Sequence, residues 1–137
     1  MLFHVVISTN YEHYRNAWDE KYVSLGAAIE RIKCLVEGAA TIFFFSDNNI
    51  SDCFDEYGLD PAEVQLDCTV CLSLYLSDED DLSDCVDWEI SRLIATWYGA
   101  YCTDILKETE YYQPLSLDSV ENDATSDERK AIETITI

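Results

Sequence analysis

The first third of the chain alternates in one stretch and then changes period. Residues 2–8 alternate apolar and polar positions well enough to predict a strand, whereas residues 9–23 are polar and aromatic and are predicted to form a loop. Ser24 can cap a helix that we expect to run to Glu37, because Gly38 then provides a stop. The apolar residues between them recur at helical spacing on one side: Ala28, Ile32, Leu35 and Val36.

The middle of the chain contains two stretches with the residue types of strands. Residues 39–46 include an uninterrupted run of β-branched and aromatic side chains, which is typical of a strand buried on both faces. Residues 63–77 alternate with a period of two and predict a strand with one buried face. Between them we expect a short helix at residues 50–57 that ends at Gly58.

The segment after residue 77 is predicted to form the second main helix. Ser77 and the acids that follow it resemble a capping box. Apolar residues then recur on one helical face: Leu82, Val86, Ile90, Leu93, Ile94 and Trp97. We expect this helix to continue to about Tyr111 and to stop before Pro114. Residues 113–137 are polar and acidic and predict a flexible tail, with a final strand at residues 132–137 as an option.

These elements predict a single α+β domain over residues 1–112 and an acidic, flexible tail over residues 113–137. The expected architecture is a small antiparallel or mixed sheet of two to four strands packed against two main helices. A small parallel α/β sheet is the alternative. A chain of 137 residues with 48% hydrophobic residues is large enough to bury the core of one such domain.

The charge changes this picture, because 28 acidic residues face only 8 lysines and arginines, for a net charge of -20. A small domain needs a net charge of only about 2–8 in magnitude to be soluble. A larger charge destabilises the compact state, because like charges repel each other. One interpretation is a generic acidic or salt-adapted protein; the other is a field that attracts a cationic partner. The scarcity of basic residues argues against nucleic acid or an anionic membrane as direct partners. No apolar run is long enough to predict a membrane span.

The acids are concentrated where bases are missing. Residues 34–91 contain no lysine or arginine and fifteen carboxylates. In the predicted second helix, Asp80, Asp84 and Asp87 would line one face about 5–6 Å apart, which is similar to the spacing of phosphates; the alternative is an ordinary solvated helix face. The carboxylates that we expect to bind a partner are Asp47, Asp52, Asp55, Glu56, Asp60, Glu63, Asp67, Asp78, Glu79, Asp80, Asp81, Asp84, Asp87 and Glu89.

Tight binding would also need anchors that lose their water in the interface. Aromatic residues near the acids are the candidates, and ordinary packing is the alternative role for each of them: Tyr57, Tyr75, Trp88, Tyr111 and Tyr112.

Neither metal nor cofactor is expected. The N-terminus has no positively charged signal-peptide region, so we expect a cytoplasmic protein, in a host's cytoplasm if it is viral. The cysteines should then be free and buried: Cys34, Cys53, Cys68, Cys71, Cys85 and Cys102. Cys68 and Cys71 form a CxxC pattern inside a predicted strand, which points them to opposite faces and disfavours zinc or redox use. A calcium-like pattern at Asp47 has Asp52 where glycine is needed and Gly58 where a bidentate glutamate is needed.

No common catalytic motif is present, and we expect the protein not to be an enzyme. There is no GxSxG, P-loop, GxGxxG or HExxH pattern, and the only histidines are His4 and His13, of which His4 is expected to be structural. In charge, size and lack of catalytic motifs the chain is similar to nucleic-acid-mimic inhibitors, which include viral anti-restriction and anti-CRISPR proteins. That resemblance implies a DNA mimic that binds the basic groove of a DNA- or RNA-binding protein.

Two other functions use the same electrostatics. One is an immunity protein or antitoxin that neutralises a basic toxin, and the other is an acidic protein-interaction module in which residues 113–137 would matter most. A homodimer is compatible with all three.

Overall fold

The computed structural model describes residues 1–11, 14–36, 68–101 and 113–135. This part of the chain forms a five-stranded sheet with the strand order β2-β1-β3-β4-β5, in which every neighbouring pair is antiparallel. The strands are β1 (Leu2–Tyr11), β2 (Tyr14–Tyr22), β3 (Cys68–Ser77), β4 (Ser91–Tyr101) and β5 (Gln113–Val120).

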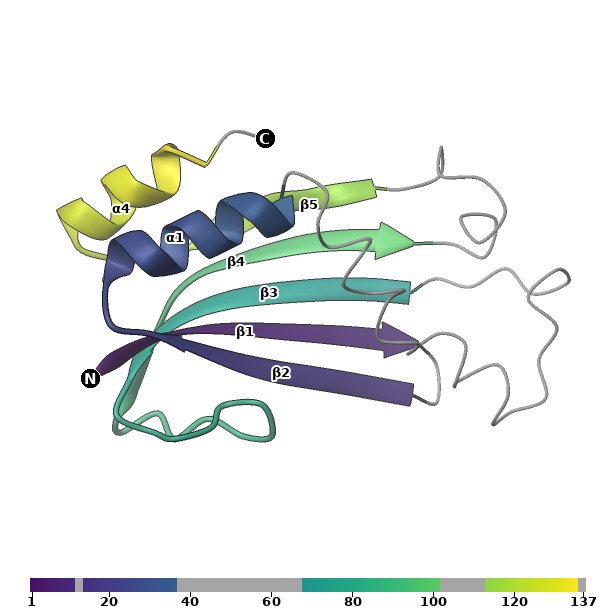
Figure 1. The fold of residues 1–137 in the computed structure, drawn as a ribbon, viewed down its shortest axis with the longest axis horizontal. Helices are drawn as coiled ribbons and strands as arrows, with labels where there is room; N and C mark the ends of the chain where they lie inside the picture. The colour runs from purple at the N-terminus through teal and green to yellow at the C-terminus, as the bar shows by residue number, and fades with distance from the viewer. Residues whose placement is uncertain (12–13, 37–67, 102–112, 136–137) are drawn as a thin grey trace, which may run out of the picture.

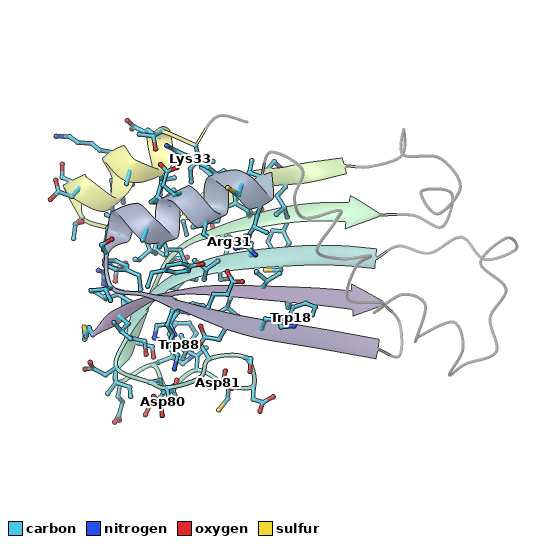
Figure 2. All side chains as sticks on the ribbon, in the orientation of Figure 1. Trp18, Arg31, Lys33, Asp80, Asp81 and Trp88 are labelled. Carbon is cyan, nitrogen blue, oxygen red and sulfur yellow. The ribbon has the colours of Figure 1, made fainter. Side chains whose placement is uncertain are left out.

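The two faces of the sheet are covered differently. The helices α1 (Leu25–Cys34) and α4 (Ser126–Glu133) lie on one face, and the loop of residues 78–90 lies on the other (Figures 1 and 2). α1 packs against β1, β2 and α4. Because successive strand residues point to opposite faces, each strand supplies one set of side chains to the helices and one set to the loop side.

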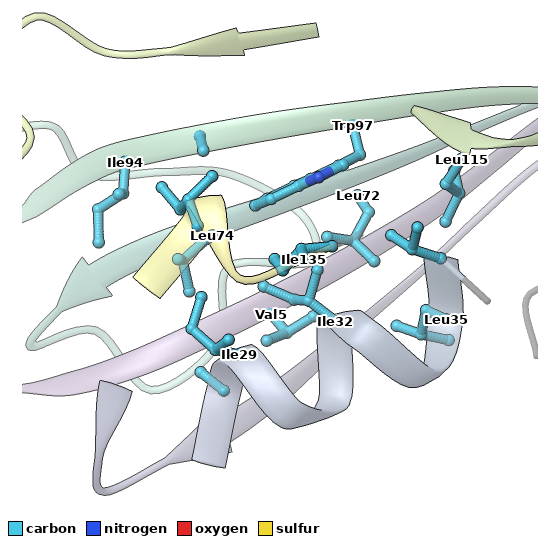
Figure 3. Packing of buried hydrophobic residues seen from close by; sticks show 14 of the residues in the cluster. Val5, Ile29, Ile32, Leu35, Leu72, Leu74, Ile94, Trp97, Leu115 and Ile135 are labelled. Atoms are coloured by element: carbon cyan, nitrogen blue, oxygen red, sulfur yellow. The ribbon is translucent and has the colours of Figure 1, made fainter. Parts of the chain in front are cut away.

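The hydrophobic core lies between the sheet and the helices (Figure 3). Trp97 of β4 and Ile32 of α1 are its largest fully buried side chains. The core consists of Val5, Ile7, Ala28, Ile29, Ile32, Leu35, Val36, Leu72, Leu74, Ile94, Ala95, Trp97, Leu115, Ile132 and Ile135. Since all four segments of the described chain contribute, the core depends on contacts between residues that are distant in sequence.

The predicted first helix and two of the predicted strands are confirmed. Ser24 caps α1 by accepting a hydrogen bond from the backbone N–H of Ala27 at 3.2 Å. β1 covers the expected first strand and extends to Tyr11, and β3 confirms the alternating strand over residues 68–77. The predicted strand at residues 39–46, the short helix at 50–57 and residues 63–67 lie outside the described residues.

The predicted loop over residues 9–23 is wrong, because β2 occupies most of it and pairs with β1. β2 places Trp18 opposite Ile7, on the helix side of the sheet. Glu20 points to the same side and breaks the apolar alternation, but Arg31 of α1 donates two hydrogen bonds to its carboxylate, at 2.8 and 3.2 Å. Because the partner of Glu20 lies in α1, the sequence of β2 alone does not indicate that this charged residue can face the core. The strand was therefore not predicted.

The predicted second main helix is also wrong. Residues 78–90 form an irregular loop, and β4 begins at Ser91. The register between β3 and β4 shifts near Leu74 and Tyr75, where Leu93 pairs with Tyr75 and Ala95 pairs with Leu74. This β-bulge adds one residue to β4 and changes which residues share a face, so the apolar spacing imitates a helix.

The expectation of a flexible tail is wrong over residues 113–135, which form a strand and a helix. β5 pairs with β4, and α4 follows it with a capping box in which Thr125 and Glu128 bond to each other's backbone N–H groups. Leu115 of β5 and Ile132 of α4 belong to the core. A final strand at residues 132–137 was the optional prediction, but residues 132 and 133 belong to α4.

The expected fold class is therefore wrong in its sheet and its helices. In the described residues, a five-stranded sheet replaces the predicted sheet of two to four strands, and the short helices α1 and α4 replace the two main helices. The parallel alternative is excluded for the described strands, which are all antiparallel to their neighbours.

Candidate functional site

Half of the predicted partner-binding carboxylates lie in one loop. Residues 78–90, here called the acidic loop, connect β3 to β4 and contain Asp78, Glu79, Asp80, Asp81, Asp84, Asp87 and Glu89. The other seven predicted residues lie outside the described residues: Asp47, Asp52, Asp55, Glu56, Asp60, Glu63 and Asp67. The acidic loop itself contains no lysine, arginine or histidine.

The stem of the acidic loop is closed by hydrogen bonds. The backbone N–H of Asp78 donates to the carbonyl of Ile90 at 3.2 Å, and the hydroxyl oxygens of Ser77 and Ser91 lie 2.6 Å apart. Ser77 also accepts a hydrogen bond from the backbone N–H of Glu79 at 2.9 Å. The loop thus leaves and rejoins the sheet at a fixed point.

A buried polar contact holds the acidic loop against the sheet. Asp19 of β2 accepts a hydrogen bond from the backbone N–H of Leu82 at 2.8 Å, and its carboxylate lies 2.8 Å from Nδ1 of His4. The side chains of His4 and Asp19 are 0% and 3% exposed. A carboxylate oxygen accepts hydrogen bonds, so the tautomer of His4 that fits this contact has its hydrogen on Nδ1. This contact, here called the His4–Asp19–Leu82 latch, joins β1, β2 and the loop.

Three of the loop carboxylates stabilise the loop itself. Asp81 accepts from the backbone N–H of Ser83 at 2.8 Å, Glu79 from Asp87 at 3.2 Å, and Asp87 from Glu89 at 3.0 Å. Hydrogen bonds from the side chain and backbone of Ser83 lower the pKa of Asp81 below its ordinary value. These acids are therefore part of the loop's architecture.

The side chains of Asp80, Asp84 and Glu89 are exposed, as Figure 2 shows for Asp80 at the outer edge of the loop. Asp80 lies 3.8 Å from Nζ of Lys21, and the amino group of Met1 lies 3.1 Å from Asp78. Among the described residues, Asp84 and Glu89 have no ion pair of their own. The outward surface of the loop is thus largely uncompensated.

Four basic side chains of the described part bind partners outside the acidic loop: Arg31 pairs with Glu20, Lys33 with Glu30, Arg92 with Glu128, and Arg129 bonds to the carbonyl groups of Glu121, Asn122 and Ala124. The three ion pairs neutralise carboxylates that do not belong to the loop. Arg92 also lines a pocket with Trp88 of the loop.

The predicted helical row of Asp80, Asp84 and Asp87 is wrong, because residues 78–90 are not helical. The regular spacing that would imitate phosphates is lost with the helix. The remaining feature is a high local density of carboxylates on a loop with a defined conformation.

A groove runs between the acidic loop and the exposed face of the sheet, with a volume of about 370 Å³. Tyr75 of β3, Tyr98 of β4 and Trp88 of the loop line it, together with the carboxylate of Asp84. The ring centroids of Tyr75 and Trp88 are 6.0 Å apart, with the planes inclined by 51°. The sequence marked Tyr75 and Trp88 as candidate anchors but gave no sign of this groove, since it exists only once the loop folds back over the strands.

The cysteines are described only in part. Cys34, Cys71 and Cys85 are free thiols, as expected, but Cys34 and Cys85 are exposed rather than buried. The side chain of Cys68 and the calcium-like pattern that starts at Asp47 lie outside the description. Within the described ranges, no cluster of three or more histidine, cysteine or acidic side chains is arranged to hold a metal ion.

Comparison of the chain with protein-family models, with curated proteins and with solved structures gives no match. Of the described helices, neither has the length and apolar character needed to cross a membrane.

Proposed function

We propose that this protein binds a basic protein surface through the acidic loop, and that it inhibits a nucleic-acid-binding protein by occupying its phosphate-binding groove. The observation that carries the proposal is the concentration of seven carboxylates on one anchored loop without a base of its own. A cationic groove that accepts phosphates would be attracted to this loop, whereas nucleic acid would be repelled by it.

The fixed conformation of the loop supports binding. The stem, the latch and the bonds made by Asp81, Glu79 and Asp87 order the loop before any partner arrives. A preordered loop loses less conformational entropy on binding. Uncompensated charge also steers encounter, with association rates of up to about 10⁸–10⁹ M⁻¹s⁻¹ at low salt.

Two features bear on the cellular setting and on an alternative function. The free thiols of Cys34, Cys71 and Cys85 are compatible with the reducing cytoplasm that we propose as its location.

An interaction module that works through a flexible acidic tail is not favoured, because β5 and α4 are packed elements that contribute Leu115 and Ile132 to the core.

Neutralising the outward carboxylates should weaken partner binding. In the triple variant Asp80→Asn, Asp84→Asn and Glu89→Gln, we expect affinity to fall about tenfold, since each exposed ion pair contributes about 0.2–1 kcal/mol. Native protein and variant would be immobilised and incubated with lysate of the source cells. Retained proteins would be identified by mass spectrometry and then purified for affinity measurements and for nucleic-acid competition.

Charge alone is controlled by a second triple variant on exposed helix positions away from the loop: Glu30→Gln, Asp127→Asn and Glu133→Gln. This variant should keep most of the affinity. Binding of the native protein should also weaken between about 0.1 M and about 1 M salt, where the Debye length shrinks from about 10 Å to about 3 Å. Equal affinity for both triple variants, or affinity that salt leaves unchanged, would contradict the proposal.

A further inference from the structure

The groove beside the acidic loop combines aromatic rings with a carboxylate. β3 and β4 supply its floor, including Tyr75 and Tyr98, and the acidic loop supplies Trp88 and Asp84. Trp88 is 63% exposed and Tyr98 is 47% exposed. A large aromatic side chain that is left in water forgoes about 1.5–3 kcal/mol of burial, so these two rings are available to a ligand.

The groove is electrostatically selective. Among the residues that the structure describes, Asp84 lines it, and no lysine or arginine does. The rings add to this preference, because the faces of aromatic π-systems are negative and attract cations. Burial raises the pKa of Tyr75, and a hydrogen bond with Cys71 raises that of Tyr98, so both phenols stay neutral donors and acceptors. A cationic ligand therefore complements the carboxylate and the aromatic rings of the groove.

The shape and the polar atoms favour a guanidinium over an ammonium group. A volume of about 370 Å³ is near the lower end for ligand pockets and suits a single side chain. The hydroxyl oxygens of Ser8 and Ser73 also line the groove and can accept hydrogen bonds. A planar guanidinium can stack on an indole and still direct its five N–H groups to hydroxyls and to a carboxylate.

We infer that the groove takes an arginine side chain of the basic partner, stacked on Trp88 between Tyr75 and Tyr98 and paired with the carboxylate of Asp84. This inference rests on the proposed function and names the anchor of that interaction. The acidic loop would attract the partner over a distance, and the inserted arginine would supply the desolvated contact that gives specific affinity.

The test uses small probes and does not need the partner. N-acetyl-arginine amide would be titrated into the ¹⁵N-labelled full chain and followed by NMR. The indole resonance of Trp88 and the amides of Tyr75 and Tyr98 should shift in a saturable way. The isosteric but neutral N-acetyl-citrulline amide should leave these resonances in place. Shifts of the same size with citrulline, or no shift with arginine, would overturn the inference, as would a lysine derivative that binds as tightly as the arginine derivative.

Matched variants locate the site. Trp88→Leu should weaken arginine binding about two- to thirtyfold, in line with the range for cation–π contacts. Asp84→Asn should weaken it clearly, whereas Asp80→Asn, which removes the same charge outside the groove, should have a much smaller effect. All three residues are exposed, and thermal unfolding would verify that the variants keep their fold.

The two proposals can fail separately. If the outward carboxylates prove necessary for partner binding while Trp88→Leu and Asp84→Asn behave like Asp80→Asn in the arginine titration, the groove is not the anchor and the proposed function stands. If arginine binds the groove but the affinity for the partner changes neither in the triple variant of the loop nor with salt, the proposed function fails. The groove then remains a cation site.

Discussion

Replacing Asp19 with alanine should lower the free energy of unfolding by about 3–5 kcal/mol and release the acidic loop from the sheet. The buried carboxylate of Asp19 contacts both His4 and the backbone N–H of Leu82. Its removal leaves two buried donors unpaired, at about 1–3 kcal/mol each, and breaking a buried pair typically costs about 3–5 kcal/mol. Urea unfolding would measure the loss, and hydrogen exchange at Leu82 and its neighbours would report the release of the loop.

Asp80→Ala is the matched control, because it removes a carboxylate from the same side of the sheet at a fully exposed position. Its effect on the free energy of unfolding should stay within about 0.5 kcal/mol. Since domains of this kind are stable by only about 5–15 kcal/mol, the Asp19 variant should be visibly less stable than this control. Equal unfolding midpoints for the two variants would show that the His4–Asp19–Leu82 latch does not stabilise the fold.

Replacing Glu128 with glutamine should destabilise the docking of α4 by about 2–4 kcal/mol near neutral pH. Arg92 of β4 donates two hydrogen bonds of 2.8 Å to this carboxylate, whose side chain is 5% exposed. The same carboxylate closes the capping box with Thr125. Losing the charge therefore weakens a largely buried pair and one helix cap at once.

The effect of Glu128→Gln should disappear in acid. The hydrogen bonds from Arg92, followed by those from Thr125, lower the pKa of Glu128 from its ordinary value of 4.5. A depressed pKa means that the contribution is complete above the ordinary pKa and is lost as the pH falls through the depressed one. Urea unfolding of native protein and variant should thus give a stability gap that is widest near neutral pH and closes as the pH falls through the lowered pKa of Glu128.

Comparing the two proteins isolates Glu128 from the other carboxylates. Protonation of the remaining acids also relieves self-repulsion, but this change affects the native protein and the variant equally. Glu133→Gln, on an exposed position of the same helix, should show no such gap. If the gap between native protein and Glu128→Gln persists unchanged in acid, the Arg92 pair does not stabilise α4.

The sequence predicted elements whose signals are local. The Ser24 cap and the apolar spacing after it were sufficient for α1, and strict alternation was sufficient for β3. β2 and β4 were missed for reasons that lie outside their own sequences. In β2, Glu20 points toward α1 and is satisfied by Arg31, and in β4 a bulge changes the period. The capping box of α4, Thr125 with Glu128, was present in the sequence but was obscured by acidic surroundings.

The candidate site was predictable in composition and not in geometry. The density of acids between Asp78 and Glu89 could be counted, and the structure brings them together in one loop. The helical spacing assigned to them was wrong. The contact between Asp19 and Leu82 joins residues 63 positions apart, so it depends on strand register and loop closure, which composition does not encode.

The connection between β3 and β4 has a consequence for how this protein could change partners. β3 is the middle strand of the sheet, and its hairpin with β4 is held together by pairing along both strands and by the contact of Ser77 with Ser91. A hairpin tip can be rewritten in length and chemistry while the strands below it keep their register. The outward side chains of the proposed recognition loop could therefore change without rebuilding the core, provided that the contacts of Leu82 with Asp19 and of Trp88 with Tyr75 are kept.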